Sequence, residues 1–241
     1  MSSPQLVLVT GAAGNVGQAV FRGLAPHFAL RAFDRVPTPG AADAHVGDLA
    51  DRAAVERAVA GAHTIIHLGG CPRMEADFMR DLVKPNIEGL WHMLDAARLA
   101  GVRRFIFASS CNVAFGATEL PQLKTDTVRA LNPYGATKAF GETLGRWFHD
   151  TYGMEFLAVR IGYFRGHYDD PALREAWLHR IWLGPRDCAK FFRLAVAAPN
   201  FGHGIVYACS RCPENYLDLT SARELLGYEP EETVPDAPAV S

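Results

Sequence analysis

The sequence predicts an α/β protein built on a doubly wound parallel sheet, and three observations support this fold class. Short runs rich in β-branched residues alternate with longer segments of helical periodicity, which is typical of successive β-α-β units. A glycine-rich turn joins the first of these runs to the first helical segment. The chain has 241 residues and no internal repeat, so we expect one large domain with a small extension.

Each element follows from its local pattern. The strand predictions rest on short apolar runs that end at Asp, Gly or Ser, and the helix predictions rest on apolar residues three and four positions apart. Pro and Gly residues at 36–40 predict a surface loop, and the pattern becomes less regular after Ile161. We therefore expect strands at 6–9, 29–33, 64–68, 104–108, 156–161 and 204–208, and helices at 18–24, 51–60, 86–100, 133–152 and 221–226.

Composition narrows the classes of protein to which the chain can belong. Apolar residues make up 49% and charged residues 21%, as in soluble globular proteins. With 24 basic and 26 acidic residues the net charge is -2, so we expect no recruitment to nucleic acid or to an anionic membrane surface. No apolar segment approaches the roughly 18–20 residues of a membrane span, and the first apolar run is too short for a signal peptide.

The cysteines predict a reducing compartment. There are five, an odd number, and no secretory signal precedes them, so we expect a cytoplasmic protein. Cys209 and Cys212 have C-x-x-C spacing, but no second Cys or His pair lies at the distance that a zinc finger requires. We interpret them as ordinary thiols and expect no metal site.

The glycine-rich turn predicts a dinucleotide site. Gly11, Gly14 and Gly17 follow a strand and open a helix, where glycines allow backbone N–H groups to approach a pyrophosphate at the positive end of the helix. Asp34 ends the second strand, where an acidic residue accepts hydrogen bonds from the adenosine ribose. Position as well as residue type therefore agrees with the dinucleotide fingerprint.

The choice between NAD and NADP depends on Asp34. A 2′-phosphate beside its carboxylate would place like charges about 4 Å apart, at a cost of about 4 kcal/mol at an effective dielectric of about 20. We therefore expect NAD as the cofactor. The adjacent Arg35 opposes this preference if its guanidinium accepts a 2′-phosphate, and otherwise it is a solvated loop residue. Asp48 fits either an adenine contact or a helix N-cap.

Three further residues predict proton-transfer chemistry. Tyr134 and Lys138 lie four positions apart at the start of a predicted helix, so both project from one face, and Ser110 ends the fourth strand. A tyrosine has a pKa of about 10, so its use as a base near neutral pH needs about 4 kcal/mol of phenolate stabilisation. A lysine ammonium about 4 Å away supplies an interaction of that size where water is scarce.

These motifs resemble those of a known superfamily. The segments TGAAGNVG at 10–17, DL at 48–49, FASS at 107–110 and YGATK at 134–138 are similar to the extended short-chain dehydrogenase/reductases, the NAD-dependent epimerase/dehydratase group. Within that group HLGG at 67–70, RIG at 160–162, Trp177 and LGYEP at 226–230 resemble uronate dehydrogenases, over nearly the whole chain. The resemblance implies a Rossmann-like sheet with a small C-terminal substrate-binding extension.

The resemblance also implies roles for individual residues. Tyr134 is expected to accept the proton, Lys138 to contact the nicotinamide ribose and lower the tyrosine pKa, and Ser110 to order the reacting hydroxyl, with Ser109 as the alternative serine. The remaining cofactor contacts are expected from the glycine-rich turn and the ends of the strands. The full set comprises Gly11, Gly14, Asn15, Val16, Gly17, Asp34, Arg35, Asp48, Leu49, Leu68, Gly69, Gly70, Asn86, Ser109, Tyr134, Lys138 and Ile161.

The substrate region departs from the uronate dehydrogenase pattern at two positions. Tyr163 stands where a serine follows Arg-Ile-Gly, and Ala172 stands where an arginine clamps the carboxylate, with Arg174 close by. Arg165, Arg174 and Arg186 are candidates to bind a carboxylate or phosphate, or else they pair with local acids. Our candidate substrate contacts are Cys111, Asn112, Tyr163, Arg165 and Arg174.

Together these motifs predict how the chain is organised and what it acts on. Residues 1–162 form an NAD-binding Rossmann core, 163–228 a small substrate-binding region that returns one strand to the sheet, and 229–241 a flexible tail. A small free sugar, sugar acid or polyol is the expected substrate, because little chain after Ile161 is left to enclose a second nucleotide.

Two other functions are compatible with these motifs, and a dimeric assembly is also expected. An epimerase of a nucleotide sugar would use NAD transiently, and a non-enzymatic dinucleotide sensor would need no tuned phenol. The resemblance implies a homodimer formed by the helices that begin near Asn86 and Pro133.

Overall fold

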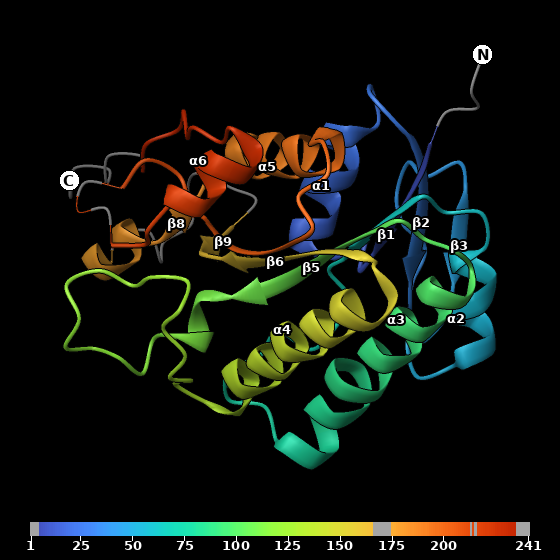
Figure 1. The fold of residues 1–241 in the computed structure, drawn as a ribbon, viewed down its shortest axis with the longest axis horizontal. Coiled ribbons are helices and arrows are strands. Elements are labelled where there is room, and N and C mark those ends of the chain that lie inside the picture. Colours follow the sequence, from blue (N-terminus) through green and yellow to red (C-terminus); the bar gives the residue numbers. More distant parts are fainter. Residues whose placement is uncertain (1–4, 166–174, 213, 215, 235–241) are drawn as a thin grey trace, which may run out of the picture.

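The protein contains the predicted parallel sheet, flanked by helices on both faces (Figure 1). The computed structural model describes residues 5–165, 175–212, 214 and 216–234. Every strand pair in the main sheet is parallel. The strand order is β3 (Ala44–Val46), β2 (Ala29–Asp34), β1 (Leu6–Thr10), β4 (Thr64–His67), β5 (Arg104–Ser110), β6 (Glu155–Ile161) and β9 (His203–Ala208).

The strand order reverses at β1, and such a switch point is where a ligand site is expected. From β1 the chain builds outward to β2 and β3, then returns to the other side of β1 and continues through β4, β5, β6 and β9. In open sheets of this kind, ligands bind beyond the carboxyl ends of the strands at such a switch point. The doubly wound α/β fold predicted from the sequence is confirmed.

Two separate apolar cores lie on the two faces of the sheet. One face is covered by α1 (Asn15–Leu24), α5 (Pro185–Ala197) and α6 (Thr220–Leu226), and the other by α2 (Arg52–Val59), α3 (Gly89–Leu99) and α4 (Pro133–Tyr152), as Figure 1 shows. The strands buried between these layers contribute alternate side chains to each core. Strand β3 and helix α5 were not predicted from the sequence.

Shorter elements complete the chain. The predicted helix 86–100 is α3 preceded by a π-helical turn, η1 (Phe78–Glu88), with Pro85 inside it. A proline cannot donate the hydrogen bond that a regular helix requires, which explains why the α-helix begins only after it. The remaining elements are the 3-10 turns η2 (Cys111–Val113) and η4 (Ala176–Arg180) and the strand pair β7 (Tyr163–Phe164) and β8 (Trp182–Leu183).

Helix α4, which presents Tyr134 and Lys138, has strong end signals. The side chain of Asn132 accepts a hydrogen bond from the Gly135 N–H at 2.8 Å, and Pro133 occupies the first helical position. Gly153 ends the helix with a φ of 72°, a conformation that favours glycine. These local signals explain why the sequence predicted both boundaries of α4.

The first residues of the predicted flexible tail are held in place. The Asp187 carboxylate accepts hydrogen bonds from the backbone N–H groups of Glu231 and Glu232, both at 2.9 Å. The buried Glu232 carboxylate in turn accepts from the Asp187 N–H at 2.7 Å. The segment 229–234 therefore differs from the expected tail, because acceptors at the N-terminus of α5 capture its backbone. Residues 235–241 lie outside the described residues.

No helix within the described ranges is long and apolar enough to cross a membrane.

Candidate active site

The glycine-rich turn brings the ends of β1 and β4 into close contact. Gly11 has a φ of 66°, and a Cβ on it would lie 2.7 Å from the Gly69 nitrogen. A Cβ on Gly17 would lie 2.0 Å from the Gly11 oxygen. Both positions therefore require glycine for packing alone. Gly14 differs, because it is exposed and serves as the N-cap of α1 without a side-chain cap, which leaves that helix end open to an anion.

Asp34 is fixed beside this turn. Its Oδ2 accepts a hydrogen bond from the Ala13 N–H at 3.0 Å, which holds the carboxylate next to the start of α1. The neighbouring Arg35 is exposed. Asp48 is not the N-cap of α2, since Asp51 fills that role by accepting from the Ala54 N–H at 3.1 Å. Asp48 lies exposed on the preceding loop, so the N-cap interpretation of this residue is excluded.

The loop after β4 passes directly over Lys138. Gly70 has a φ of 146°, and a Cβ on it would lie 2.9 Å from Asn86 Oδ1 and 4.0 Å from Lys138 Nζ. The Asn86 side chain accepts from the Cys71 N–H at 2.7 Å and donates to the Cys71 carbonyl at 3.1 Å. Its amide also donates to Thr137 Oγ1 at 3.0 Å. Asn86 thus clamps this loop to α4, and its side-chain groups are occupied by protein partners.

Ser110, Tyr134 and Lys138 converge at the carboxyl end of β5. All three are buried, and the Ser110 side chain lies near enough to the Tyr134 phenol to act on its pKa. Lys138 Nζ lies 5.7 Å from the centroid of the Tyr134 ring and 4.9 Å from that of Phe107. The sequence predicted this convergence, because parallel strands and the helices after them place their polar ends at one edge of the sheet.

The Lys138 ammonium is buried without a carboxylate partner among the described residues. Burial lowers its pKa from 10.5 to about 8, and only the nearby Cys71 thiol opposes this shift. Within the same residues Lys138 Nζ contacts the rings of Phe107 and Tyr134 but forms no hydrogen bond. A buried cation with unused donors is costly. The site is therefore suited to a ligand that brings hydrogen-bond acceptors, as the hydroxyls of a ribose do.

Without a bound ligand, the Tyr134 phenol stays protonated near neutral pH and cannot act as a base. Burial raises the pKa of the phenol to about 12, and the nearby Ser110 side chain opposes that rise. Lys138 is not among the causes of the shift. The predicted lowering of the tyrosine pKa by Lys138 is thus not produced by the protein groups on their own.

Ser109 faces away from this site. Its hydroxyl donates to Glu142 Oε1 at 2.5 Å, and Glu142 also accepts two hydrogen bonds from Arg160, each of 2.8 Å. Because successive side chains of a strand point to opposite faces, only one of two adjacent serines can reach the site. The structure places Ser110 there. A side-chain role for Ser109 toward the cofactor or the substrate does not fit this arrangement.

The structure describes four of the five predicted substrate residues. Cys111 is buried, and burial raises its pKa to about 12, while Asn112 donates to Ser110 Oγ at 3.1 Å. Tyr163 lies on β7, where its hydroxyl accepts from Arg165 Nε at 2.8 Å. Arg174 lies outside the described residues. Ile161 ends β6 opposite Ser110 and is half-buried.

Cys71 and Arg73 are site residues that were not predicted from the sequence. The Cys71 thiol lies within electrostatic range of Tyr134 and Lys138, and its presence raises the pKa of Arg73. Arg73 also forms an ion pair with Asp81 at 3.1 Å. Their position directly after Gly70, at the carboxyl end of a central strand, was the signal that could have identified them.

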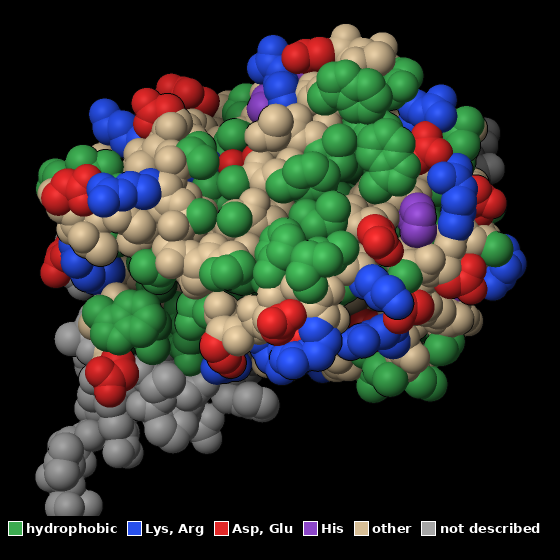
Figure 2. All heavy atoms as spheres, turned by 90° about the horizontal axis from the view of Figure 1, so that it is seen from below, with side chains coloured by type: hydrophobic (Ala, Val, Ile, Leu, Met, Phe, Trp, Pro, Cys, Tyr) green, Lys and Arg blue, Asp and Glu red, His purple; other side chains and the backbone are tan. Residues whose placement is uncertain are grey.

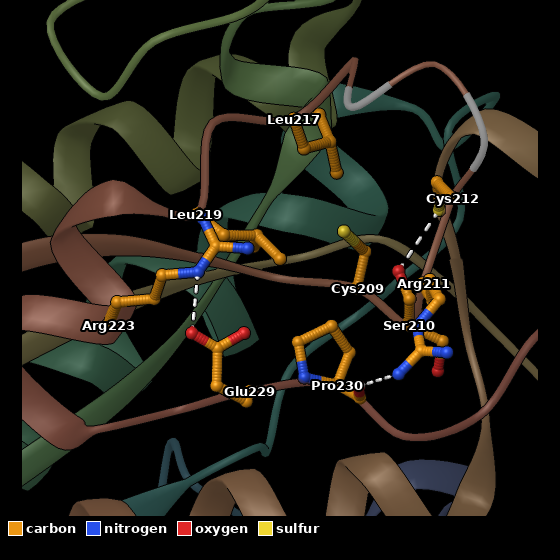
Figure 3. Close-up of a pocket in the computed structure, with 9 residues that line it drawn as sticks. All are labelled: Cys209, Ser210, Arg211, Cys212, Leu217, Leu219, Arg223, Glu229 and Pro230. Atoms are coloured by element: carbon orange, nitrogen blue, oxygen red, sulfur yellow. Dashed lines mark hydrogen bonds and ion pairs between the residues drawn. The ribbon is translucent and has the colours of Figure 1, made fainter.

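The C-x-x-C motif lies apart, in a cavity of about 150 Å³ at the carboxyl end of β9 (Figure 3). Cys209 and Cys212 are free, and the Cys212 thiol donates to the Ser210 carbonyl oxygen at 3.2 Å. The interaction of the two neighbouring thiols raises the pKa of Cys209 and lowers that of Cys212. Arg223 and Glu229 also line the cavity and pair with each other at 2.9 Å (Figure 3). Across the part of the chain that the structure describes, no group of three or more His, Cys, Asp or Glu residues is placed to hold a metal ion.

The fold and this site define the class of the protein. A glycine-rich strand–turn–helix at the switch point of a parallel sheet, with a buried Tyr-x-x-x-Lys pair beside a strand-end serine, is the arrangement of an extended short-chain dehydrogenase/reductase. The chain belongs to the NAD-dependent epimerase/dehydratase family, whose model matches residues 7–184. The resemblance predicted from the sequence is confirmed.

Known relatives cover almost the whole chain. It is 36% identical to an NAD-dependent glucose-6-phosphate dehydrogenase of Haloferax volcanii, over 95% of this chain and 94% of that protein. It is 33% identical to a uronate dehydrogenase of Pseudomonas syringae, over 94% and 82%. Among solved structures, a mutant uronate dehydrogenase of Agrobacterium tumefaciens in complex with NAD matches with a TM-score of 0.82 and 32% identity, over 95% of this chain and 85% of that one.

The uncompensated charge of Lys138 predicts a pH dependence of stability. Because the pKa of Lys138 is lowered from 10.5 to about 8 in the folded protein, the unfolded chain binds more protons between about pH 8 and pH 10.5. The stability of the wild type therefore rises, relative to a Lys138→Met variant, as the pH increases through this window. We expect the difference in free energy of unfolding to change by about 3 kcal/mol between about pH 7 and pH 10.5.

Urea denaturation of both proteins at the two pH values measures this change. Lys84→Met serves as the control, because Lys84 is exposed and its variant should track the wild type at both pH values. A difference between Lys138→Met and wild type that stays constant with pH would show that the ammonium is not buried without compensation.

Proposed function

We propose that the protein is an NAD-dependent dehydrogenase of a small free sugar or sugar acid, with Tyr134 as the general base. The observation that carries this proposal is the convergence of the Ser110 hydroxyl, the Tyr134 phenol and the Lys138 ammonium at the switch point of the sheet. Its relatives named glucose-6-phosphate dehydrogenase and uronate dehydrogenase support the substrate class. Both are dehydrogenases, which favours net oxidation over epimerisation of a nucleotide sugar.

The protein groups fit a bound NAD. The open N-terminus of α1 at Gly14 would receive the pyrophosphate, and the fixed carboxylate of Asp34 would accept hydrogen bonds from the adenosine ribose. The unused donors of Lys138 bind the hydroxyls of the nicotinamide ribose. Because Asp34 is anchored by the Ala13 N–H, a 2′-phosphate would meet its charge at short range, so NAD is preferred over NADP.

Each catalytic group has a separate task in this proposal. Ser110 donates a hydrogen bond at the reacting oxygen, and Tyr134 takes the proton from the sugar hydroxyl, which is the anomeric one for a uronate-like substrate. When bound, NAD supplies the carbon that accepts the hydride from the oxidised sugar carbon. Lys138, whose Nζ lies 5.7 Å from the centroid of the Tyr134 ring, would hold the nicotinamide ribose beside the phenol.

Replacement of Tyr134 by phenylalanine tests this function directly. We expect the wild type to form NADH with a member of a panel of aldoses, uronates and sugar phosphates, detected by absorbance at about 340 nm. Tyr134→Phe should lower kcat by a factor of about 10² to 10⁴, because the proton acceptor is lost. Tyr152→Phe is the matched control on the same helix, since Tyr152 is exposed at the other end of α4 and should leave kcat unchanged.

Two results would contradict the proposal. One is full activity of Tyr134→Phe. The other is turnover of a nucleotide sugar by the wild type without net NADH, which is the behaviour of an epimerase.

We also propose that the protein is a homodimer formed through α3 and α4. Four large aromatic side chains on these helices are between 40% and 45% exposed, namely Trp91, Phe140, Trp147 and Tyr152. Figure 2 shows hydrophobic side chains gathered on the face that these helices cover. Trp91 and Trp147 stack with ring centroids 6.4 Å apart, which presents a continuous apolar surface. Exposed apolar patches of this kind mark protein interfaces.

Sedimentation of a Trp147→Glu variant tests the dimer. A charge at the centre of the patch should convert the dimer to monomer, because burial of an unpaired carboxylate is costly. Trp177→Glu is the control, since Trp177 is 54% exposed on η4, away from α3 and α4. A monomeric wild type, or a Trp147→Glu dimer of unchanged affinity, would contradict the proposal.

We propose a cytoplasmic location, because all five cysteines are free thiols in a fold that needs no disulfide. Recovery of the protein in an oxidising compartment by cell fractionation would contradict this.

A further inference from the structure

A continuous chain of hydrogen bonds links the N-terminus of α4 to Ser110. The Gly135 N–H donates to Asn132 Oδ1 at 2.8 Å, and Asn132 Nδ2 donates to Asn112 Oδ1 at 3.1 Å. Asn112 Nδ2 then donates to Ser110 Oγ at 3.1 Å, and the Asn112 backbone N–H donates to the same oxygen at 3.2 Å. Ser110 and Asn112 are buried, at 6% and 8% exposure, so water does not compete freely for these bonds.

The direction of every bond in this chain is fixed by its first donor. A backbone N–H can only donate, so Asn132 must turn its carbonyl oxygen toward Gly135 and its amino group toward Asn112. Asn112 must in turn face its amino group toward Ser110. The Asn112 orientation therefore follows from helix geometry and needs no assumption about the proton on Ser110.

Two donors converge on one hydroxyl oxygen. A serine oxygen has two acceptor lone pairs and one proton. With the side-chain and backbone N–H groups of Asn112 occupying both lone pairs, Ser110 is left with a single function, that of a donor. The Ser110 side chain lies beside the Tyr134 phenol and the Cys111 thiol, and it opposes the rise in the pKa of both groups.

We propose that Asn112 is a positioning residue that makes Ser110 an obligatory hydrogen-bond donor and thereby assigns proton acceptance to Tyr134 alone. This inference rests on the proposed dehydrogenase function. A sugar hydroxyl cannot donate to Ser110, because both lone pairs are occupied, and so its proton is directed to the phenol. In the step itself the sugar O–H bond breaks and its proton moves to Tyr134, while bound NAD would accept the hydride from the carbon that bears this oxygen. Asn112, suggested by the sequence as a substrate contact, acts through Ser110.

The titratable groups around this relay do not offer an alternative acceptor. Burial keeps the Cys111 thiol protonated, with a pKa of about 12, and the Cys71 thiol faces Tyr134 from the loop after β4. Lys138 faces the phenol from α4, and His67 on β4 is buried, with a pKa lowered to about 3. The positive charge of Arg160 on β6 lowers the pKa of Cys111, but burial outweighs this effect. Within the described part of the chain, no carboxylate contributes to the pKa of Tyr134.

Neutron diffraction of the deuterium-exchanged protein tests the relay without any turnover. The expected map shows both Asn112 N–D groups directed at Ser110 Oγ and the Ser110 deuteron directed away from Asn112, toward Tyr134. An Asn112 carbonyl facing Ser110, or a Ser110 deuteron directed at Asn112, would overturn the proposal. This result decides the assignment even if no sugar is oxidised, in which case only the proposed function fails.

Kinetics of two variants test its consequence. Asn112→Leu keeps the size and removes the side-chain donor, so kcat should fall by about tenfold, the value of one hydrogen bond to a developing charge. The acidic limb of the pH profile of kcat should move to higher pH, because the phenolate loses stabilisation, while KM for the sugar stays nearly constant. Asn132→Ser keeps a helix cap but is too short to reach Asn112, and it should give a smaller change in the same direction.

Thr143→Val is the matched control, since it removes one hydrogen bond from the exposed face of α4 and should leave kcat and the pH profile unchanged. The proposal is overturned if Asn112→Leu raises KM for the sugar while kcat and the pH profile stay those of the wild type, because that is the signature of a substrate contact.

Discussion

The burial of one ammonium group organises this site. Lys138 projects from the second turn of α4 into the space beyond the central strands, where aromatic rings, a thiol and backbone lie around its charge. In folded proteins a lysine ammonium is normally exposed to solvent or paired with a carboxylate. Retention of an unpaired cation here has a physical reason if a ligand completes its hydrogen bonds. Without the ligand, burial of the Lys138 ammonium lowers the stability of the protein. When the ligand binds and accepts its hydrogen bonds, the recovered free energy contributes to the affinity.

The surrounding architecture holds this group and its neighbours in register. Parallel pairing brings the ends of β1, β4 and β5 to one edge of the sheet, and glycines permit the close approach of these ends. Asn86 fixes the loop over Lys138, and Asn112 fixes the serine beside Tyr134. Two buried asparagines thus orient groups that would otherwise rotate. In both cases the hydrogen bonds of the amide stabilise the fold and also orient a group of the active site.

Local patterns in the sequence predicted the parts of the site that depend on local geometry. Tyr134 and Lys138 were found because four-residue spacing places them on one face of α4, the helix predicted to start near Pro133. The sequence favoured Ser110 over Ser109 as the catalytic serine, but it did not reveal that Ser109 donates to Glu142 instead. The Asn132–Asn112 bond joins loops 20 residues apart, which no periodicity reveals. Composition also suggested mobility for 229–234, where the captured backbone depends on Asp187 from a distant helix.

In our interpretation, Lys138 is buried without a carboxylate partner among the described residues because bound NAD would complete its hydrogen bonds. Calorimetric titration of NAD into the wild type and into Lys138→Met at neutral pH is the decisive experiment. We expect NAD to bind the wild type at least about tenfold more tightly, the value of a hydrogen bond to a charged group. Equal affinity of the two proteins for NAD would contradict this interpretation.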